Sequence, residues 1–183
     1  MPPHADLQLE EKILKAAQRL WRTRGESGLT LRAVAKEAGT TTPTVYKRFR
    51  NKQALRAALA DRVRSQLNEY LFASKSLEEV CRHYLTFAET HPHEYRLLLY
   101  AWSDIFRPDL PRPGRAWLMT KFAERFGGKP ADYSRPVYAL MLLSHGAATL
   151  LSLPSEEIAR EEVRRNFMAI AETLIKQTRL FRG

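Results

Sequence analysis

The chain has 183 residues, with 30 Lys and Arg, 20 Asp and Glu, and one cysteine. This length suits one ordinary domain or a small module fused to a larger one, and it can bury a core without disulfides or metals. A composition of 44% hydrophobic and 27% charged residues excludes a wholly disordered chain. The sequence has no apolar run near the ~18 residues of a membrane span, and its N-terminus does not have the pattern of a secretory signal. A single cysteine is typical of a reducing cytoplasm, which is where we expect the protein.

Charge and aromatic residues are unevenly distributed along the chain. Residues 1–66 carry 14 Lys and Arg against 6 Asp and Glu, a net charge of +8, whereas residues 67–183 carry a net +2. Of the aromatic residues, only Trp21, Tyr46 and Phe49 lie in the first segment. This division predicts a module that binds a polyanion, joined to a domain that packs or forms a pocket. The alternative is that the basic residues only solvate the surface.

Apolar residues near the N-terminus recur at helical spacing. Positions 13, 16, 17, 20 and 21 form one stripe of an amphipathic helix that Gly25 and Gly28 should end. A short second helix is expected after Thr30, a good N-cap residue. Gly39 follows it, at the position where helices end in a left-handed turn.

A third and a fourth helix are expected directly afterwards. Thr42 can cap the third helix, with Pro43 at its first position, where a missing amide hydrogen costs nothing. Val45 and Phe49, four residues apart, are its expected buried side, and Asn51 can cap the fourth helix.

The rest of the chain also favours helices. They are predicted over residues 77–90, 92–102, 116–126 and 134–153 and, after Ser155 as a cap, to near the C-terminus. The sequence has no segment that alternates with the period of two expected for a strand. The fold is therefore predicted to be all-α, with about nine helices.

The two short helices over about residues 31–50, joined by a tight turn, predict a helix-turn-helix. In such a unit the second helix enters the major groove of DNA with its N-terminal residues nearest the base edges. Tyr46 and Lys52 are candidates for phosphate, because a rigid phenol and an ammonium beside helix N-terminal amides both suit an anion. The candidate DNA-binding residues on these helices are Arg32, Thr41, Thr42, Pro43, Thr44, Tyr46, Lys47, Arg48 and Lys52.

Residues from about 10 to 67 resemble the DNA-binding domain of the tetracycline-repressor (TetR) family. The segments that carry this resemblance are Ile13-Leu14-Lys15-Ala16-Ala17, Gly25, Leu29-Thr30-Leu31, Val34-Ala35, Ala38-Gly39, Pro43-Thr44-Val45-Tyr46, Phe49 and Asn51-Lys52-Gln53-Ala54-Leu55.

The resemblance implies an all-helical homodimer that binds a near-palindromic operator in double-stranded DNA and releases it when a small molecule occupies the C-terminal domain. It also implies phosphate contacts from Thr30, Tyr46 and Lys52. Arg48 departs from the His or Tyr that is common before the Phe, which leaves its role open. We expect two domains: residues 1–67, which bind DNA, and residues 68–183, which bind the effector and form the dimer. The C-terminal run His91–Leu98 and the pair His145-Gly146 look similar to one ligand-domain subgroup of the family.

The last two helices are the expected dimer interface, since small residues in one could approach an apolar face of the other across a twofold axis. The alternative is that both faces pack only within one subunit. The predicted interface residues are Ser144, Ala147, Ala148, Leu151, Val163, Phe167, Ile170 and Leu174.

Aromatic and sulfur-containing residues of the C-terminal part are candidates for a pocket that takes a small apolar or aromatic effector. The candidates are Tyr84, Phe87, Tyr100, Trp102, Trp117, Met119, Phe122, Tyr138, Met141 and His145. About half of them are expected to be plain core. His145 fits a hydrogen-bonded core histidine better than a ligand contact.

The sequence predicts no enzyme, since it has no nucleophile elbow, zinc-protease motif, phosphate-binding glycine loop or Cys-x-x-Cys motif. Ser144 and His145 are neighbours on one predicted helix. Their side chains therefore point about 100° apart and cannot form a nucleophile–base pair. We expect no catalytic residues and no cofactor. We also expect no metal, because His91 and His93 lack further ligands nearby. An all-helical protein-interaction module would explain the C-terminal helices but not the basic N-terminal segment. A sequence-specific transcriptional regulator, acting as a repressor, explains both.

Overall fold

The computed structural model describes residues 3–100, 112–154 and 156–181, and all its regular secondary structure is helical. This confirms the all-α prediction. The α-helices are α1 (Pro3–Gly28), α2 (Leu31–Glu37), α3 (Thr42–Arg48), α4 (Lys52–Phe72), α5 (Leu77–Thr90), α6 (Pro92–Tyr100), α7 (Pro113–Phe126), α8 (Ser134–Leu151) and α9 (Glu157–Lys176). Two 3-10 turns, η2 (Pro130–Tyr133) and η3 (Thr178–Phe181), complete the described elements. None of the described helices combines the length and apolar character needed to cross a membrane.

The chain divides into two compact units that are not continuous in sequence. The N-terminal unit contains residues 1–65 and 93–102, and the C-terminal unit contains residues 66–92 and 103–183. These units differ from the expected division after residue 67, because α6 belongs with the N-terminal helices from His93 onward. Periodicity could not show this, because it reports which face of a helix is buried but not which partner buries it.

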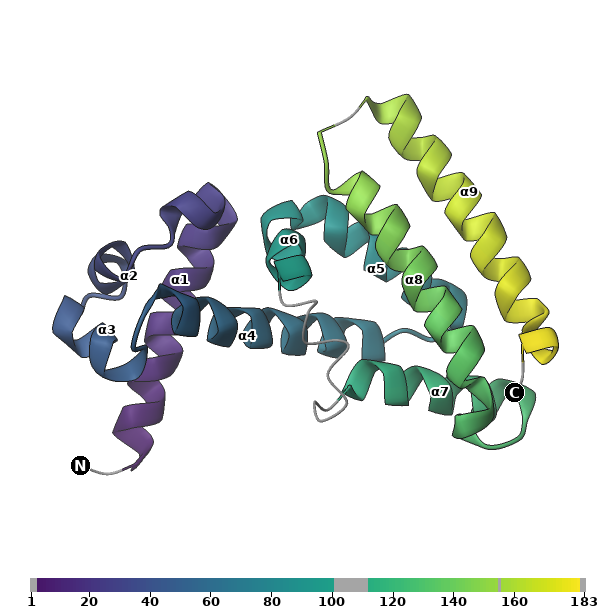
Figure 1. Ribbon diagram of the computed structural model, residues 1–183, viewed down its shortest axis with the longest axis horizontal. Helices are drawn as coiled ribbons and strands as arrows, with labels where there is room; N and C mark the ends of the chain where they lie inside the picture. The colour runs from purple at the N-terminus through teal and green to yellow at the C-terminus, as the bar shows by residue number, and fades with distance from the viewer. Residues whose placement is uncertain (1–2, 101–111, 155, 182–183) are drawn as a thin grey trace. The chain divides into compact units, whose positions relative to one another are not determined.

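The N-terminal unit is built on the apolar stripe of α1. Ile13 and Trp21 of α1, Val34 of α2, Val45 of α3 and Leu59 of α4 are all at most 2% exposed. Figure 1 shows α2 and α3 as two short helices joined by a tight turn. At Gly25 the backbone of α1 leaves helical geometry (φ 58°), which explains the predicted helix end there.

The C-terminal unit packs α8 against both α5 and α9, with α7 against α5 and α8. In Figure 1, α8 and α9 are the long green and yellow helices that lie side by side. Its buried core includes Leu85, Phe122, Leu140, Leu151 and Ile175.

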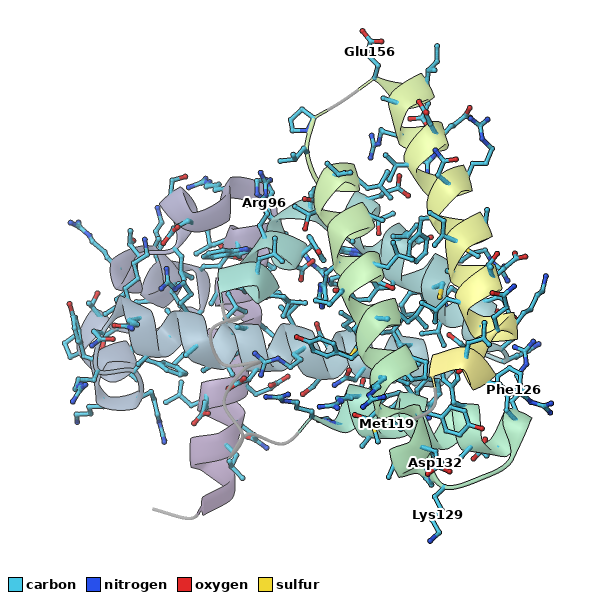
Figure 2. All side chains as sticks on the ribbon, turned by 45° about the vertical axis from the view of Figure 1, so that its right-hand side comes forward. Arg96, Met119, Phe126, Lys129, Asp132 and Glu156 are labelled. Atoms are coloured by element: carbon cyan, nitrogen blue, oxygen red, sulfur yellow. The ribbon has the colours of Figure 1, made fainter. Side chains whose placement is uncertain are left out.

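The segment between α7 and α8 turns tightly through two glycines with positive φ, Gly127 (74°) and Gly128 (84°). It is closed by a hydrogen bond from the Lys129 amide to the Asp132 carboxylate (2.8 Å) and by one from the Tyr133 hydroxyl to the Gly127 carbonyl. Figure 2 labels Phe126 at the end of α7, with Lys129 and Asp132 on this turn.

Two predicted caps differ from the structure. The N-cap of α3 is Thr41 rather than Thr42, since the Thr41 hydroxyl accepts the amide of Thr44 (3.3 Å). The backbone of Thr41 is extended, so Thr41 lies just outside the helix, as an N-cap residue does. The N-cap of α9 is Glu156, and the predicted cap Ser155 lies outside the described residues. Asn51 does cap α4, with its side-chain oxygen 2.8 Å from the Ala54 amide.

Candidate DNA-binding site

The helix-turn-helix is formed by α2 and α3. Thr30 caps α2 by accepting the Ala33 amide (3.1 Å). Gly39 then takes a left-handed conformation (φ 58°), which reverses the chain between the two helices at no steric cost to glycine. Val45 and Phe49, at 0% and 5% exposure, anchor α3 to the unit. The second helix is therefore held by one side, and its other side faces solvent.

The predicted DNA-binding residues on and beside this motif are all at least partly exposed. Tyr46 is 52% exposed although it is aromatic, and Lys47 beside it is exposed. Thr42, Thr44 and Arg48 are half-buried. The other predicted members are exposed: Thr30, Arg32, Thr41, Pro43 and Lys52.

The hydroxyls of Thr41, the N-cap of α3, and of Thr44 are already oriented by local hydrogen bonds. Thr41 Oγ1 lies 2.8 Å from Thr44 Oγ1 and also accepts the Thr44 amide. Because a hydroxyl both donates and accepts, this pair can still take one further partner. The N-terminal turn of α3 thus presents oriented polar groups of the kind that meet base edges or phosphates.

Lys52 begins α4 and is fixed to the end of α1. Its ammonium donates to the Glu26 carbonyl oxygen (3.1 Å), while the Glu26 carboxylate pairs with Arg56 (3.0 Å). An ammonium has three donors, so Lys52 can hold this contact and still face an anion. Its position beside the first amides of α4 is favourable for phosphate.

Five acidic side chains of the N-terminal unit pair with arginines, and one of them, Glu37, lies on α2. These ion pairs are Glu11–Arg62, Glu26–Arg56, Glu37–Arg19, Asp61–Arg64 and Glu94–Arg22. The hydrogen bond from Arg62, together with the nearby charge, holds the pKa of Glu11 below its usual value.

Several exposed cations on or beside α2 and α3 take part in no ion pair within the described part of the chain: Arg32, Lys36, Lys47 and Arg50. Sequence reasoning omitted Lys36 and Arg50. Lys36 lies four residues after Arg32 and so shares its face of α2, a spacing that was visible in the sequence. The pairing leaves uncompensated positive charge concentrated on the helix-turn-helix.

In the C-terminal unit the predicted pocket residues fall into different environments. Tyr84 of α5 and His145 of α8 are joined by a hydrogen bond between the hydroxyl and Nδ1 (2.6 Å). Burial lowers the pKa of His145 to about 3, so the ring is neutral at physiological pH. His145 is therefore a neutral, half-buried histidine with a hydrogen bond that joins α8 to α5.

Other candidates divide between core and surface. Phe122 is fully buried against Phe126 and Tyr133, with ring centroids 6.0 and 5.6 Å away, and Phe87 is also buried, so both are core residues. Tyr138 is 41% exposed. The half-buried candidates are Trp117, which packs on Phe72 (4.9 Å), Met119 and Met141. The side chain of Tyr100 and all of Trp102 lie outside the described residues.

The predicted dimer face needs correction. Ser144, Ala147, Ala148, Leu151 and Phe167 are at most 8% exposed in the single chain. Their side chains are used inside the subunit, where α8 packs on α5 and α9, and leave little surface for a second copy. Small residues at helical spacing were mistaken for an external face because close helix packing requires the same pattern inside a subunit. Of the predicted set, Val163 and Leu174 are half-buried and Ile170 is 53% exposed.

A different apolar face of α8 and α9 is exposed. Tyr138, Leu142, Gly146 and Leu150 recur every fourth residue along one ridge of α8, and Leu142 and Leu150 are 48% and 56% exposed. A methyl group added at Gly146 would meet no atom within 4 Å. These residues form the exposed ridge of the C-terminal unit, and Ile170 of α9 is also exposed.

The N-terminal helices match a known family. Residues 13–59 match the model of the family described as "Bacterial regulatory proteins, tetR family". This segment, about a quarter of the chain, is therefore similar to tetR-family regulatory proteins. The matched segment contains α2 and α3, so the helix-turn-helix described above lies within the part of the chain that the family model covers. No curated protein matches the chain.

Solved structures of tetR-family proteins share the fold over nearly the whole chain. A TetR transcriptional regulator from Streptomyces coelicolor matches 94% of this chain and 99% of its own, with 22% identity and a TM-score of 0.70. TetR from Acinetobacter baumannii AYE matches over 93% and 97%, with 19% identity and a TM-score of 0.69. A tetR-family regulator from Haemophilus influenzae matches over 89% and 96%, with 23% identity and a TM-score of 0.56. The all-helical architecture of both units is thus that of solved tetR-family proteins.

Proposed function

We propose that this protein is a homodimeric transcriptional repressor of the tetR family, which binds a near-palindromic operator and is released by a small-molecule effector. The observation that carries the proposal is the charge distribution of the N-terminal unit. Five of its acidic side chains pair with arginines outside α2 and α3, while Arg32, Lys36, Lys47 and Arg50 on or beside the helix-turn-helix form no ion pair within the described residues. Such a surface attracts phosphates and releases their counterions.

The proposed contacts follow from what each side chain offers. Thr30, Tyr46 and Lys52 contact phosphates, since they are exposed at or near helix N-termini or on the outer side of α3. The residues proposed to face the major groove are Arg32, Thr41, Thr42, Pro43, Thr44, Lys47 and Arg48. Arg48 or Lys47 would read guanine through O6 and N7, and the threonines would meet bases or thymine methyl groups.

A second copy of the chain is proposed to cover the exposed ridge of the C-terminal unit. Two half-exposed leucines on one ridge leave apolar surface in water, and a twofold contact would bury the same ridge from both subunits. A dimer would place two α3 helices in successive major grooves, about one helical turn or roughly 34–36 Å apart. This spacing is why the operator is expected to be near-palindromic.

The proposed effector is a small, mainly apolar or aromatic molecule bound in the C-terminal unit. A Q116A variant of the Acinetobacter baumannii TetR has been solved in complex with minocycline. In this chain, the half-buried Trp117, Met119 and Met141 and the Tyr84–His145 pair offer apolar walls and a polar point. An effector with higher affinity for a state that no longer fits the operator would release the DNA by population shift. The proposal includes a cytoplasmic location, no cofactor for DNA binding and no catalytic activity.

The test is an in vitro selection of random DNA duplexes with the purified protein at two salt concentrations. Enrichment of a near-palindrome, bound more weakly at higher salt, supports the proposal and supplies the operator for an effector screen. Binding that depends on salt without any enriched sequence would indicate a non-specific DNA binder. No binding at low salt, after denaturing and refolding to remove copurified small molecules, would contradict the proposal.

A further inference from the structure

A chain of polar side chains joins α6 to α1 and α4 inside the N-terminal unit. The carboxylate of Glu94, only 1% exposed, accepts hydrogen bonds from Nε2 of Gln18 (2.6 Å) and Nε of Arg22 (2.8 Å). The other end of the Gln18 amide accepts Nε of Arg62 on α4 (2.8 Å). Arg62 in turn pairs with Glu11 of α1 (2.5 Å).

A second tie fixes the same turn of α6. The indole N–H of Trp21 donates to the His93 carbonyl (2.6 Å), and Trp21 is 2% exposed. The imidazole of His93 lies so close to Gly25 that a Cβ there would be 3.0 Å from Nδ1. Gln18, Trp21 and Arg22 follow i, i+3, i+4 spacing, so one face of α1 receives α6.

The order of donors and acceptors in this network is directional. A buried carboxylate is stable only when it is paired with a cation and hydrogen-bonded. On α1, Arg22 supplies the cation for Glu94 and Gln18 supplies a further hydrogen bond. The Gln18 amide must turn its nitrogen to Glu94 and its oxygen to Arg62, because a carboxylate only accepts and a guanidinium only donates. No other orientation of that amide satisfies both neighbours.

The network reaches the helix-turn-helix through α1 and α4. Arg19 of α1 pairs with Glu37 of α2 (2.8 Å), and Arg56 of α4 pairs with Glu26 near the end of α1 (3.0 Å). The position of α1 therefore sets where α2 is held, and the second ion pair ties α1 to α4. Glu94 contributes to that placement from 72 and 76 residues away in sequence.

We propose that Glu94 is a positioning residue for DNA binding: its buried carboxylate, bonded to Gln18 and Arg22, holds α1 and α4 in the arrangement that presents α2 and α3 to DNA. The proposal rests on the proposed function, since it assigns Glu94 to the same DNA-binding surface. It predicts that the charge and bond order of the network matter for affinity in protein that remains fully folded.

The test is a swap of the two central residues in the full-length chain. Glu94→Gln leaves one amide donor facing another donor, and Gln18→Glu places two carboxylates against each other. The double variant Q18E/E94Q restores every donor–acceptor match, because Glu at 18 accepts from Arg62 and from Gln at 94, whose oxygen accepts from Arg22. Each single variant is expected to weaken binding of the selected duplex about tenfold, the size of one charge-assisted hydrogen bond. The double variant is expected to return to within about twofold of the parent.

Affinities are measured at a temperature where every variant is folded by circular dichroism. The matched control is Glu89→Gln, which removes a carboxylate paired with Arg164 in the C-terminal unit (2.5 Å) and should lower the melting temperature without changing DNA affinity. If the single variants melt earlier yet bind DNA as the parent does, Glu94 is merely structural and the proposal is wrong. Failure of the swap to restore affinity would also overturn it.

The role of Glu94 can also be tested if the protein proves not to bind DNA. If the parent protein selects no duplex, the same four proteins are compared by amide hydrogen exchange in α1 and α2. Lower protection in both single variants, restored in the swap, supports the network as the holder of α1 and α2. Unchanged protection in the single variants contradicts it.

Discussion

Tyr46 and Lys52 offer a phosphate different interactions, and this difference can be measured. Lys52 brings a full charge, so Lys52→Ala should weaken binding to all duplexes alike and reduce the salt slope by about one. Tyr46→Phe removes only a hydroxyl, so it should weaken binding with the slope unchanged. Binding titrations against salt distinguish the two.

Lys52 also donates to the Glu26 carbonyl, so the loss of that bond needs a control. Lys52→Gln keeps a donor for Glu26 but removes the charge, and it should show the same shallower slope. A change of base preference at one position with an unchanged slope would show that Lys52 does not contact phosphate.

His145 should make the stability of the fold depend on pH. Burial lowers its pKa to about 3, whereas an unfolded histidine titrates near 6.5. The unfolded chain therefore takes up a proton that the folded chain refuses, and stability is lost as the pH falls below about 6.5. Between pH 7.5 and 5.5 this linkage amounts to about 1.4 kcal/mol.

The check is urea unfolding of the parent protein and of His145→Gln, which keeps a hydrogen-bond partner for Tyr84 but does not titrate. The variant should lose about 1.4 kcal/mol less than the parent over that pH range. Equal losses in both proteins would show that His145 is not the group responsible.

At the scale of elements, the turn between α2 and α3 depends on the left-handed backbone of Gly39 (φ 58°). Only Lys12 Nζ, at 3.8 Å, lies near a Cβ added there, so a substitution meets a conformational cost rather than a steric clash. Gly39→Ala should therefore lower the free energy of unfolding by about 1–2 kcal/mol. Gly39→Asn should cost less, because asparagine tolerates this conformation.

Urea unfolding of the two variants measures that difference directly. Equal costs for alanine and asparagine would mean that the left-handed conformation is not what the position requires. The sequence predicted this turn from a glycine placed between two short amphipathic segments.

At the scale of the whole molecule, the exposed ridge of α8 decides whether two copies associate. Leu142→Glu places a charge where the proposed dimer would exclude water, so the dimer dissociation constant should rise at least tenfold. Ala116→Glu, at an exposed position in the first turn of α7, is the matched control and should not change association.

Sedimentation velocity across a concentration series measures association, and titration with the selected duplex measures the consequence for DNA. Affinity for the duplex should fall together with dimerisation, because a single α3 reads only one half-site. A Leu142→Glu protein that stays dimeric would show that the second copy binds elsewhere.

The sequence by itself determined the features that depend on neighbours along the chain. Helical periodicity, the cap Asn51 and the turn at Gly39 are set within a few residues, and they predicted an all-α chain with a helix-turn-helix. The charge of the first 66 residues, net +8, indicated a polyanion partner. The same local patterns carried the resemblance to the TetR family.

Only the tertiary structure decided which faces are used inside the subunit and which remain outside. Ala148 and Leu142 belong to the same apolar helix, yet Ala148 is fully buried and Leu142 is 48% exposed. Likewise, Glu94 looked like an ordinary helix-start acid but is buried against Gln18, 76 residues away. Periodicity gives the direction of a side chain around its own helix, whereas burial and hydrogen bonding depend on the distant segment that packs there.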